Sequence, residues 1–93
     1  MKDAGPDDAR QFFEVANQFV ALANDLAEEH GRPRVAAAIL WAASRYGSFA
    51  WAMSGAPGRQ PPDEALELFG AQYRRMMQDN LRQMLAEFDP PKE

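Results

Sequence analysis

Three stretches of the chain place apolar residues at spacings of three and four. In the first stretch these residues are Phe12, Val15, Phe19, Leu22 and Leu26. In the second they are Val35, Ile39, Ala42, Tyr46, Phe49 and Met53. In the third they are Leu66, Gly70, Tyr73, Met77, Leu81, Met84 and Phe88. Residues three and four apart share one face of an α-helix, so the pattern predicts three amphipathic helices and no strands.

Glycine and proline residues mark where these helices begin and end. Gly31 and Pro33 separate the first helix from the second, and a Gly- and Pro-rich segment separates the second from the third. The predicted helices span about residues 7–30, 34–54 and 62–88, with a loop at 55–61. A short first connection makes the first two helices antiparallel. We therefore expect an all-α single domain over residues 1–93, an up-down-up bundle of three long helices that a second protomer can complete.

The predicted middle helix is apolar on nearly every side. A row of small residues runs along it: Ala36, Ala43, Gly47 and Ala50. A helix of this kind is normally buried on most of its sides, which two partner helices cannot easily achieve. Two hypotheses follow. Either the other two helices pack tightly against the small-residue row, or Trp41, Trp51 and Gly47 belong to a two-fold homodimer interface.

Charge is distributed unevenly along the chain, although the net charge is only −4. Residues 1–31 carry seven acids and two bases, residues 32–62 carry four arginines and no acid, and residues 63–93 carry seven acids and four bases. An acidic protein repels phosphate backbones, so we expect no nucleic-acid partner. The sequence contains neither a secretory signal nor an apolar run of the roughly 20 residues that a bilayer requires, so we expect a cytoplasmic protein with no membrane role.

Residues suited to catalysis or metal binding are scarce. The chain has no cysteine, and its single histidine, His30, cannot form a multi-histidine metal site. The sequence has no phosphate-binding glycine loop and no set of side chains that resembles a nucleophilic triad. We therefore expect no catalytic residues, no bound metal and no cofactor, and a protein that is not an enzyme.

Arg45 is unusual because it lies in the middle of the apolar helix. One interpretation is that its stem lies along apolar surface with the guanidinium in water. A second is that it pairs with a carboxylate, for which Glu14, Asp25 and Asp79 are candidates. A third is that it binds the anionic group of a ligand.

Three segments resemble a known family: FFEVANQFVALAN at 12–24, WAASRYGSF at 41–49 and FGAQYRRMMQDNL at 69–81. They are similar to small bacterial proteins grouped as domain of unknown function 3144, and the likeness extends over most of the chain. The resemblance implies a helical bacterial protein, and it implies no activity. Gly47 departs from the family pattern, in which we expect Asn. The polar positions that match the pattern are Asn17, Asn24, Arg45, Gln72, Tyr73, Arg74 and Asn80.

Two pairs among these positions share a helix face, namely Asn17 with Asn24 and Tyr73 with Asn80. Asparagine is a mediocre helix former, so its placement inside helices suggests specific hydrogen bonds. The pairs indicate either a buried polar network that fixes helix register or a ligand site.

Two functional hypotheses follow from these patterns. The first is a non-enzymatic interaction module that homodimerises through the middle helix and binds itself or another protein. The alternative is a small-molecule binding module with a polar pocket inside the bundle. In that alternative the binding residues are Asn24, Arg45, Tyr46, Tyr73 and Asn80.

Overall fold

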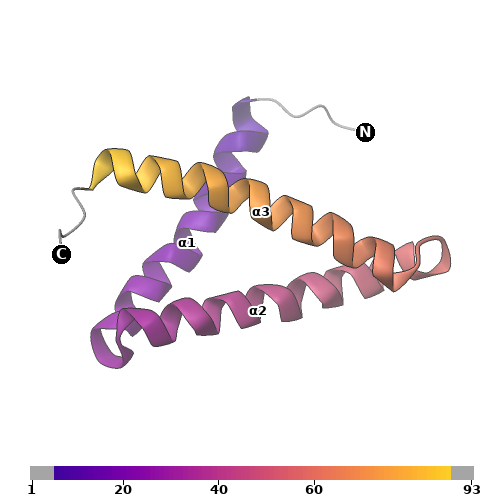
Figure 1. The fold of residues 1–93 in the computed structure, drawn as a ribbon, viewed down its shortest axis with the longest axis horizontal. Coiled ribbons are helices and arrows are strands. Elements are labelled where there is room, and N and C mark those ends of the chain that lie inside the picture. Colours follow the sequence, from indigo (N-terminus) through magenta and orange to yellow (C-terminus); the bar gives the residue numbers. More distant parts are fainter. Residues whose placement is uncertain (1–5, 89–93) are drawn as a thin grey trace. The chain divides into compact units, whose positions relative to one another are not determined.

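A computed structural model describes residues 6–88 of the chain. Its helices are α1 (Pro6–His30), α2 (Arg32–Met53) and α3 (Pro62–Glu87), with a short 3₁₀ helix, η1 (Ala56–Gly58), before α3 (Figure 1). The described residues contain no strand, so the predicted all-α class with three long helices is confirmed. The predicted loop at 55–61 is more ordered than expected, because η1 lies within it.

The chain divides into two compact units, Met1–Phe49 and Ala50–Glu93. The boundary falls inside α2, so the first unit contains α1 and most of α2. The second unit contains the last turn of α2, then η1 and α3.

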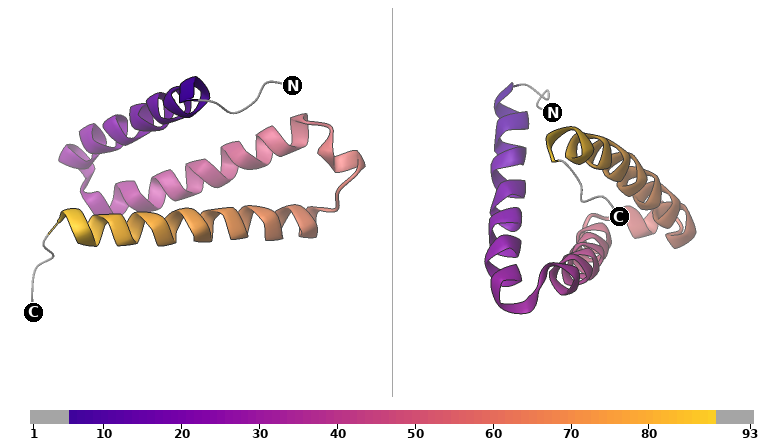
Figure 2. Two further views of the ribbon diagram at one scale, coloured as in Figure 1. Left: turned by 90° about the horizontal axis from the view of Figure 1, so that it is seen from above. Right: turned by 60° about the vertical axis from the view of Figure 1, so that its left-hand side comes forward.

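A single glycine reverses the chain between α1 and α2. Gly31 has a φ of 90°, a left-handed conformation that residues with a Cβ rarely adopt. Its N–H donates to the carbonyl of Ala27 at 2.8 Å, and its own carbonyl accepts from the N–H of Val35 at 3.2 Å. Because one residue is sufficient for the turn, α2 begins at Arg32, earlier than predicted. From this turn α1 and α2 run back as a hairpin that opens with distance from Gly31 (Figures 1 and 2).

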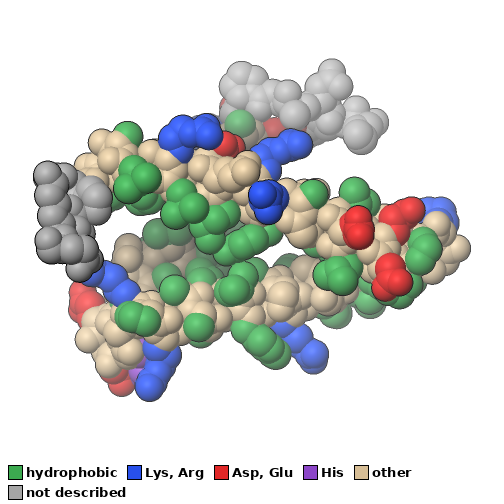
Figure 3. Space-filling model, viewed as in Figure 1, with side chains coloured by type: hydrophobic (Ala, Val, Ile, Leu, Met, Phe, Trp, Pro, Cys, Tyr) green, Lys and Arg blue, Asp and Glu red, His purple; other side chains and the backbone are tan. Residues whose placement is uncertain are grey.

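The hairpin of the first unit buries few side chains. Val35, close to the turn, is 8% exposed and is the only buried residue described in this unit. The half-buried apolar residues of α1 are all alanines, namely Ala16, Ala23 and Ala27. Most residues of α2 are exposed within this unit, because α1 diverges from it beyond the turn. The expectation that α2 is buried on most of its sides stays a prediction. Hydrophobic side chains are visible at the surface along α2, beside basic ones (Figure 3).

The second unit is held together locally around the end of α2. Trp51 Nε1 donates a hydrogen bond to Gln60 Oε1 at 2.7 Å, which ties the last turn of α2 to the segment after η1. Gly55, with a φ of 83°, supplies the left-handed residue that η1 needs before it. Helix α3 then begins at Pro62 with Asp63 and Glu64 in its first turn, where acids favour the helix dipole.

Candidate interaction surface

The two tryptophans predicted at an interface have different environments. Trp41 is 65% exposed and makes no side-chain hydrogen bond with any described residue. Trp51 is half-buried and is bound to Gln60 within its own unit. Ten residues separate them, so their side chains point about 80° apart around the helix axis. Trp41 is therefore available to a partner, whereas Trp51 has a structural role.

Gly47 lies on a side of α2 that has open space beside it. A Cβ added at this position meets no atom of the described residues within 4 Å. Ala36, Ala43 and Ala50, the other members of the small-residue row, are all exposed. Helix α1 therefore does not pack tightly against this row, although its small residues permit another backbone to approach.

The five residues predicted to bind a ligand are divided between the two units. Asn24, Arg45 and Tyr46 are exposed in the first unit, and no hydrogen bond joins any two of them. Tyr73 and Asn80 are exposed on α3 in the second unit, and no hydrogen bond joins them either. The structure thus gathers neither group around a common ligand.

Asn24 does line a depression beside the turn between α1 and α2. Its other lining residues are Ala27, Glu28 and Arg32, and its volume is about 360 Å³. Arg45 lies thirteen residues beyond Arg32, or roughly 20 Å along α2 at 1.5 Å per residue. The depression is therefore separate from the pocket predicted around Arg45.

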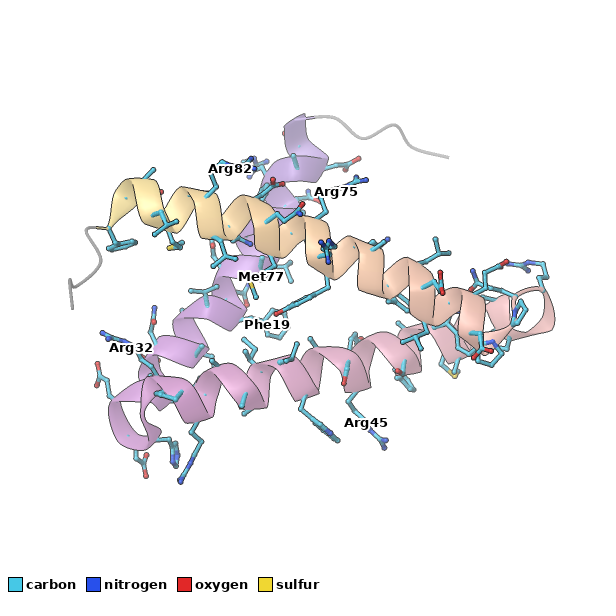
Figure 4. The ribbon with its side chains drawn as sticks, in the orientation of Figure 1. Phe19, Arg32, Arg45, Arg75, Met77 and Arg82 are labelled. Carbon is cyan, nitrogen blue, oxygen red and sulfur yellow. The ribbon has the colours of Figure 1, made fainter. Side chains whose placement is uncertain are left out.

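Arg45 extends from α2 into solvent (Figure 4). Within its unit it makes no ion pair with the described carboxylates, including the candidates Glu14 and Asp25. Glu14 instead accepts from Arg10 at 3.1 Å, and Asp79 in the second unit lies 4.0 Å from Arg82. The first of the three interpretations, with the guanidinium in water, agrees with this environment.

Arg34 and Trp41 lie on the same side of α2 as Arg45. The three residues are spaced by seven and four, which places them in one row along the helix. All three are exposed, and neither arginine forms an ion pair with any described residue of the first unit. We name this row the arginine–tryptophan stripe. Arg34 is absent from the residues predicted from sequence. The feature that could have identified it is its helical spacing to Trp41 and Arg45.

Helix α1 also presents large apolar side chains to solvent. Phe12 and Phe13 form an edge-to-face pair with ring centroids 5.0 Å apart, and both are more than half exposed. Phe19, which Figure 4 labels, is similarly exposed. A contiguous apolar surface of this kind marks an interaction site more often than an isolated exposed residue does.

Neither unit by itself buries a polar or charged side chain among the described residues, so the predicted polar network is not formed within one unit. Asn17 and Asn24 are both exposed on α1. The buried network and the ligand site both stay predictions.

Two further kinds of site do not occur within residues 6–88. No group of three or more acidic or histidine side chains in this range could hold a metal ion. None of its helices has a stretch long and apolar enough to cross a lipid bilayer.

Comparison with known proteins gives one match. A family described as Protein of unknown function (DUF3144) matches residues 12–85, which confirms the resemblance seen in the sequence. No curated protein and no solved structure matches the chain.

Proposed function

The chain belongs to this family of unknown function, which assigns no activity, and we propose from its surface that it is a non-enzymatic protein-interaction module that homodimerises through α2. The observation that carries the proposal is the exposure of large apolar side chains on the α1–α2 hairpin. Trp41, Tyr46 and Phe49 of α2 are each more than half exposed, and so are Phe12 and Phe19 of α1.

The hairpin leaves most of its large apolar side chains unburied. Fully burying one large apolar side chain contributes about 1.5–3 kcal/mol. The first unit buries only Val35 among its described residues, so most of this contribution is unused within the unit. A second copy supplies a complementary apolar surface without any other protein, and a two-fold dimer buries each patch twice.

Within α2, Trp41 is the residue best suited to anchor the contact. Tryptophan and arginine dominate the energetically important positions of protein interfaces, and Trp41 lies between two exposed arginines. Charged residues at the rim with an aromatic residue at the centre match the usual anatomy of such a contact. Trp51 is less suited, because its indole N–H is already bound to Gln60.

Light scattering after size-exclusion chromatography tests the proposal directly. We expect a mass of twice 10.4 kDa at micromolar concentration. Native mass spectrometry of freshly purified protein tests the alternative function at the same time. A monomer that retains a small molecule would support the binding module with Arg45 in its pocket, and would contradict the interaction module.

Substitution of the proposed anchor gives a sharper test. We expect Trp41→Ala to raise the dimer dissociation constant by about 30-fold, which corresponds to roughly 2 kcal/mol for a central aromatic residue. Sedimentation equilibrium measures this change. Leu85→Ala is the matched control, because Leu85 on α3 is exposed to a similar extent, and it should leave the dimer unchanged. A dissociation constant that Trp41→Ala leaves unchanged, as the control does, would contradict a contact centred on Trp41.

A further inference from the structure

Helices α1 and α2 carry pairs of opposite charges with the same spacing. Glu14 and Asp25 on α1 are eleven residues apart, and so are Arg34 and Arg45 on α2. Eleven residues make about three helical turns, so each pair is on one side of its helix and spans roughly 16 Å. All four residues are exposed and belong to the first unit.

The two pairs are also offset from one another by the same short distance along the hairpin. Counted from Gly31, Asp25 is six residues before the turn and Arg34 is three after it, whereas Glu14 is seventeen before and Arg45 is fourteen after. Both offsets are three residues, or roughly 4.5 Å, which is within the reach of an arginine side chain. They nevertheless form no ion pairs with one another within the chain. Each hairpin therefore presents an acidic pair on α1 and a basic pair on α2 that match in length and do not satisfy one another.

Neighbouring residues make each charged pair part of a mixed surface. Trp41 lies between Arg34 and Arg45 in the arginine–tryptophan stripe. On α1, Val15 and Leu22 border the acidic side, and both are 54% exposed. Each helix thus carries apolar side chains, whose burial is favourable, and charged side chains, which determine the helix that it pairs with.

Like charges exclude two of the three simple ways to join two hairpins. A two-fold antiparallel contact between two copies of the stripe would place Arg34 of one copy opposite Arg45 of the other. A contact between two copies of the α1 side would place carboxylate opposite carboxylate. Only the packing of α1 against α2 brings opposite charges together, and the two charged pairs then have the same eleven-residue spacing.

Among the described residues, one ion pair competes for these four side chains, and it joins Glu14 to Arg10. This ion pair joins residues four apart on the surface of α1 and is 3.1 Å long. Exposed pairs of this kind contribute little, since water screens both charges. Glu14 is therefore free to exchange Arg10 for an arginine of another molecule.

We propose that the homodimer is reciprocal, with α1 of each copy packed against α2 of the other so that Asp25 and Glu14 face Arg34 and Arg45 of the second copy. This inference rests on the proposed homodimer and specifies its arrangement. The dimer contains two equivalent α1–α2 contacts related by a two-fold axis. The apolar residues provide its stability, and the charges fix which helices pair and in which register.

A charge swap between the helices tests the arrangement. The first variant carries Arg34→Glu and Arg45→Glu, so both of its helices are acidic on the contact sides. The second carries Glu14→Arg and Asp25→Arg, so both are basic. We expect each variant alone to dimerise at least about tenfold more weakly than the wild type, because every contact then opposes like charges. An equimolar mixture should recover the dimer, with one chain of each kind, as native mass spectrometry resolves by mass.

The matched control reverses two arginines outside the proposed contact. Arg75→Glu with Arg82→Glu on α3 makes the same change in net charge as the first variant, and both arginines are exposed (Figure 4). It should dimerise as the wild type does. Circular dichroism checks that every variant retains its helix content.

The outcomes separate this inference from the proposed function. A wild-type dimer with an unaffected second variant would indicate contact between two α2 helices and overturn the reciprocal arrangement alone. An unaffected first variant would indicate contact between two α1 helices, which would overturn both the reciprocal arrangement and dimerisation through α2. A wild type that is monomeric at every concentration measured would overturn both.

Ionic strength provides a test that needs no variant. In the reciprocal arrangement attractive charges are screened by salt, so the wild-type dimer should dissociate more readily as sodium chloride rises from about 0.05 to 0.5 M. A dimer that becomes tighter with added salt would contradict the arrangement, since it would indicate repulsion or a purely apolar contact.

Discussion

At the scale of single residues, two glycines illustrate different requirements of the backbone. Gly31 has a φ of 90° at the turn between α1 and α2, whereas Gly47 has an ordinary helical conformation inside α2. An added Cβ would meet no described atom within 4 Å at either position. The two sites therefore differ in conformation and not in available space, which makes them a matched pair.

We expect Gly31→Ala to lower the free energy of unfolding by about 1–2 kcal/mol, because alanine is strained in the left-handed region. Gly47→Ala should raise it by about 0.5–1 kcal/mol, because alanine is the better helix former and the space is open. Urea unfolding followed by circular dichroism measures both. A loss of stability in Gly47→Ala would show that another backbone approaches this side of α2, as the predicted close packing at the small-residue row requires.

At the scale of secondary-structure elements, the helices and their ends were predictable from the sequence. The spacing of apolar residues and the position of Gly31 act through the local backbone, so they determine α1, α2 and α3 without reference to the rest of the molecule. The 3₁₀ helix η1 was missed, because Pro57 between two glycines reads equally well as an irregular loop. The role of Trp51 was also missed, since its hydrogen bond to Gln60 depends on how this loop folds.

The Trp51–Gln60 hydrogen bond should stabilise the connection between α2 and α3. We expect Gln60→Ala to lower the free energy of unfolding by about 0.5–1.5 kcal/mol, because it leaves the half-buried indole N–H without its partner. Thermal unfolding measures the loss. Gln83→Ala is the control, since its hydrogen bond to Glu87 is exposed on α3, and it should have almost no effect. Similar losses of stability from both substitutions would show that the Trp51–Gln60 hydrogen bond contributes no more than an exposed one.

At the scale of the whole molecule, the main property is the apolar surface that the α1–α2 hairpin leaves exposed. If a second copy covers this surface, folding and association are linked, and stability depends on protein concentration. We expect the melting temperature to rise by several degrees between about 1 and 100 µM protein, as observed for coupled folding and dimerisation. A melting temperature independent of concentration over this range would argue against the dimer.

The candidate site was only partly predictable at this scale. Trp41 was identified because two tryptophans in one small helix exceed what a small core accommodates, and its exposure agrees with that reasoning. Asn24 and Arg45 were grouped on the assumption of a closed interior, which the first unit does not provide. The single domain over residues 1–93 and the up-down-up bundle remain predictions.

The sequence by itself determined the family, the all-α class, the three helices and the glycine turn between the first two. The helices and the turn depend on interactions between residues within a few positions of each other, so composition and spacing are sufficient to predict them. Only the tertiary structure decided which side chains are covered, because burial depends on where a whole helix is directed after its turn. Trp41, Arg34 and Arg45 are exposed on α2, and this exposure makes α2 the surface to test first.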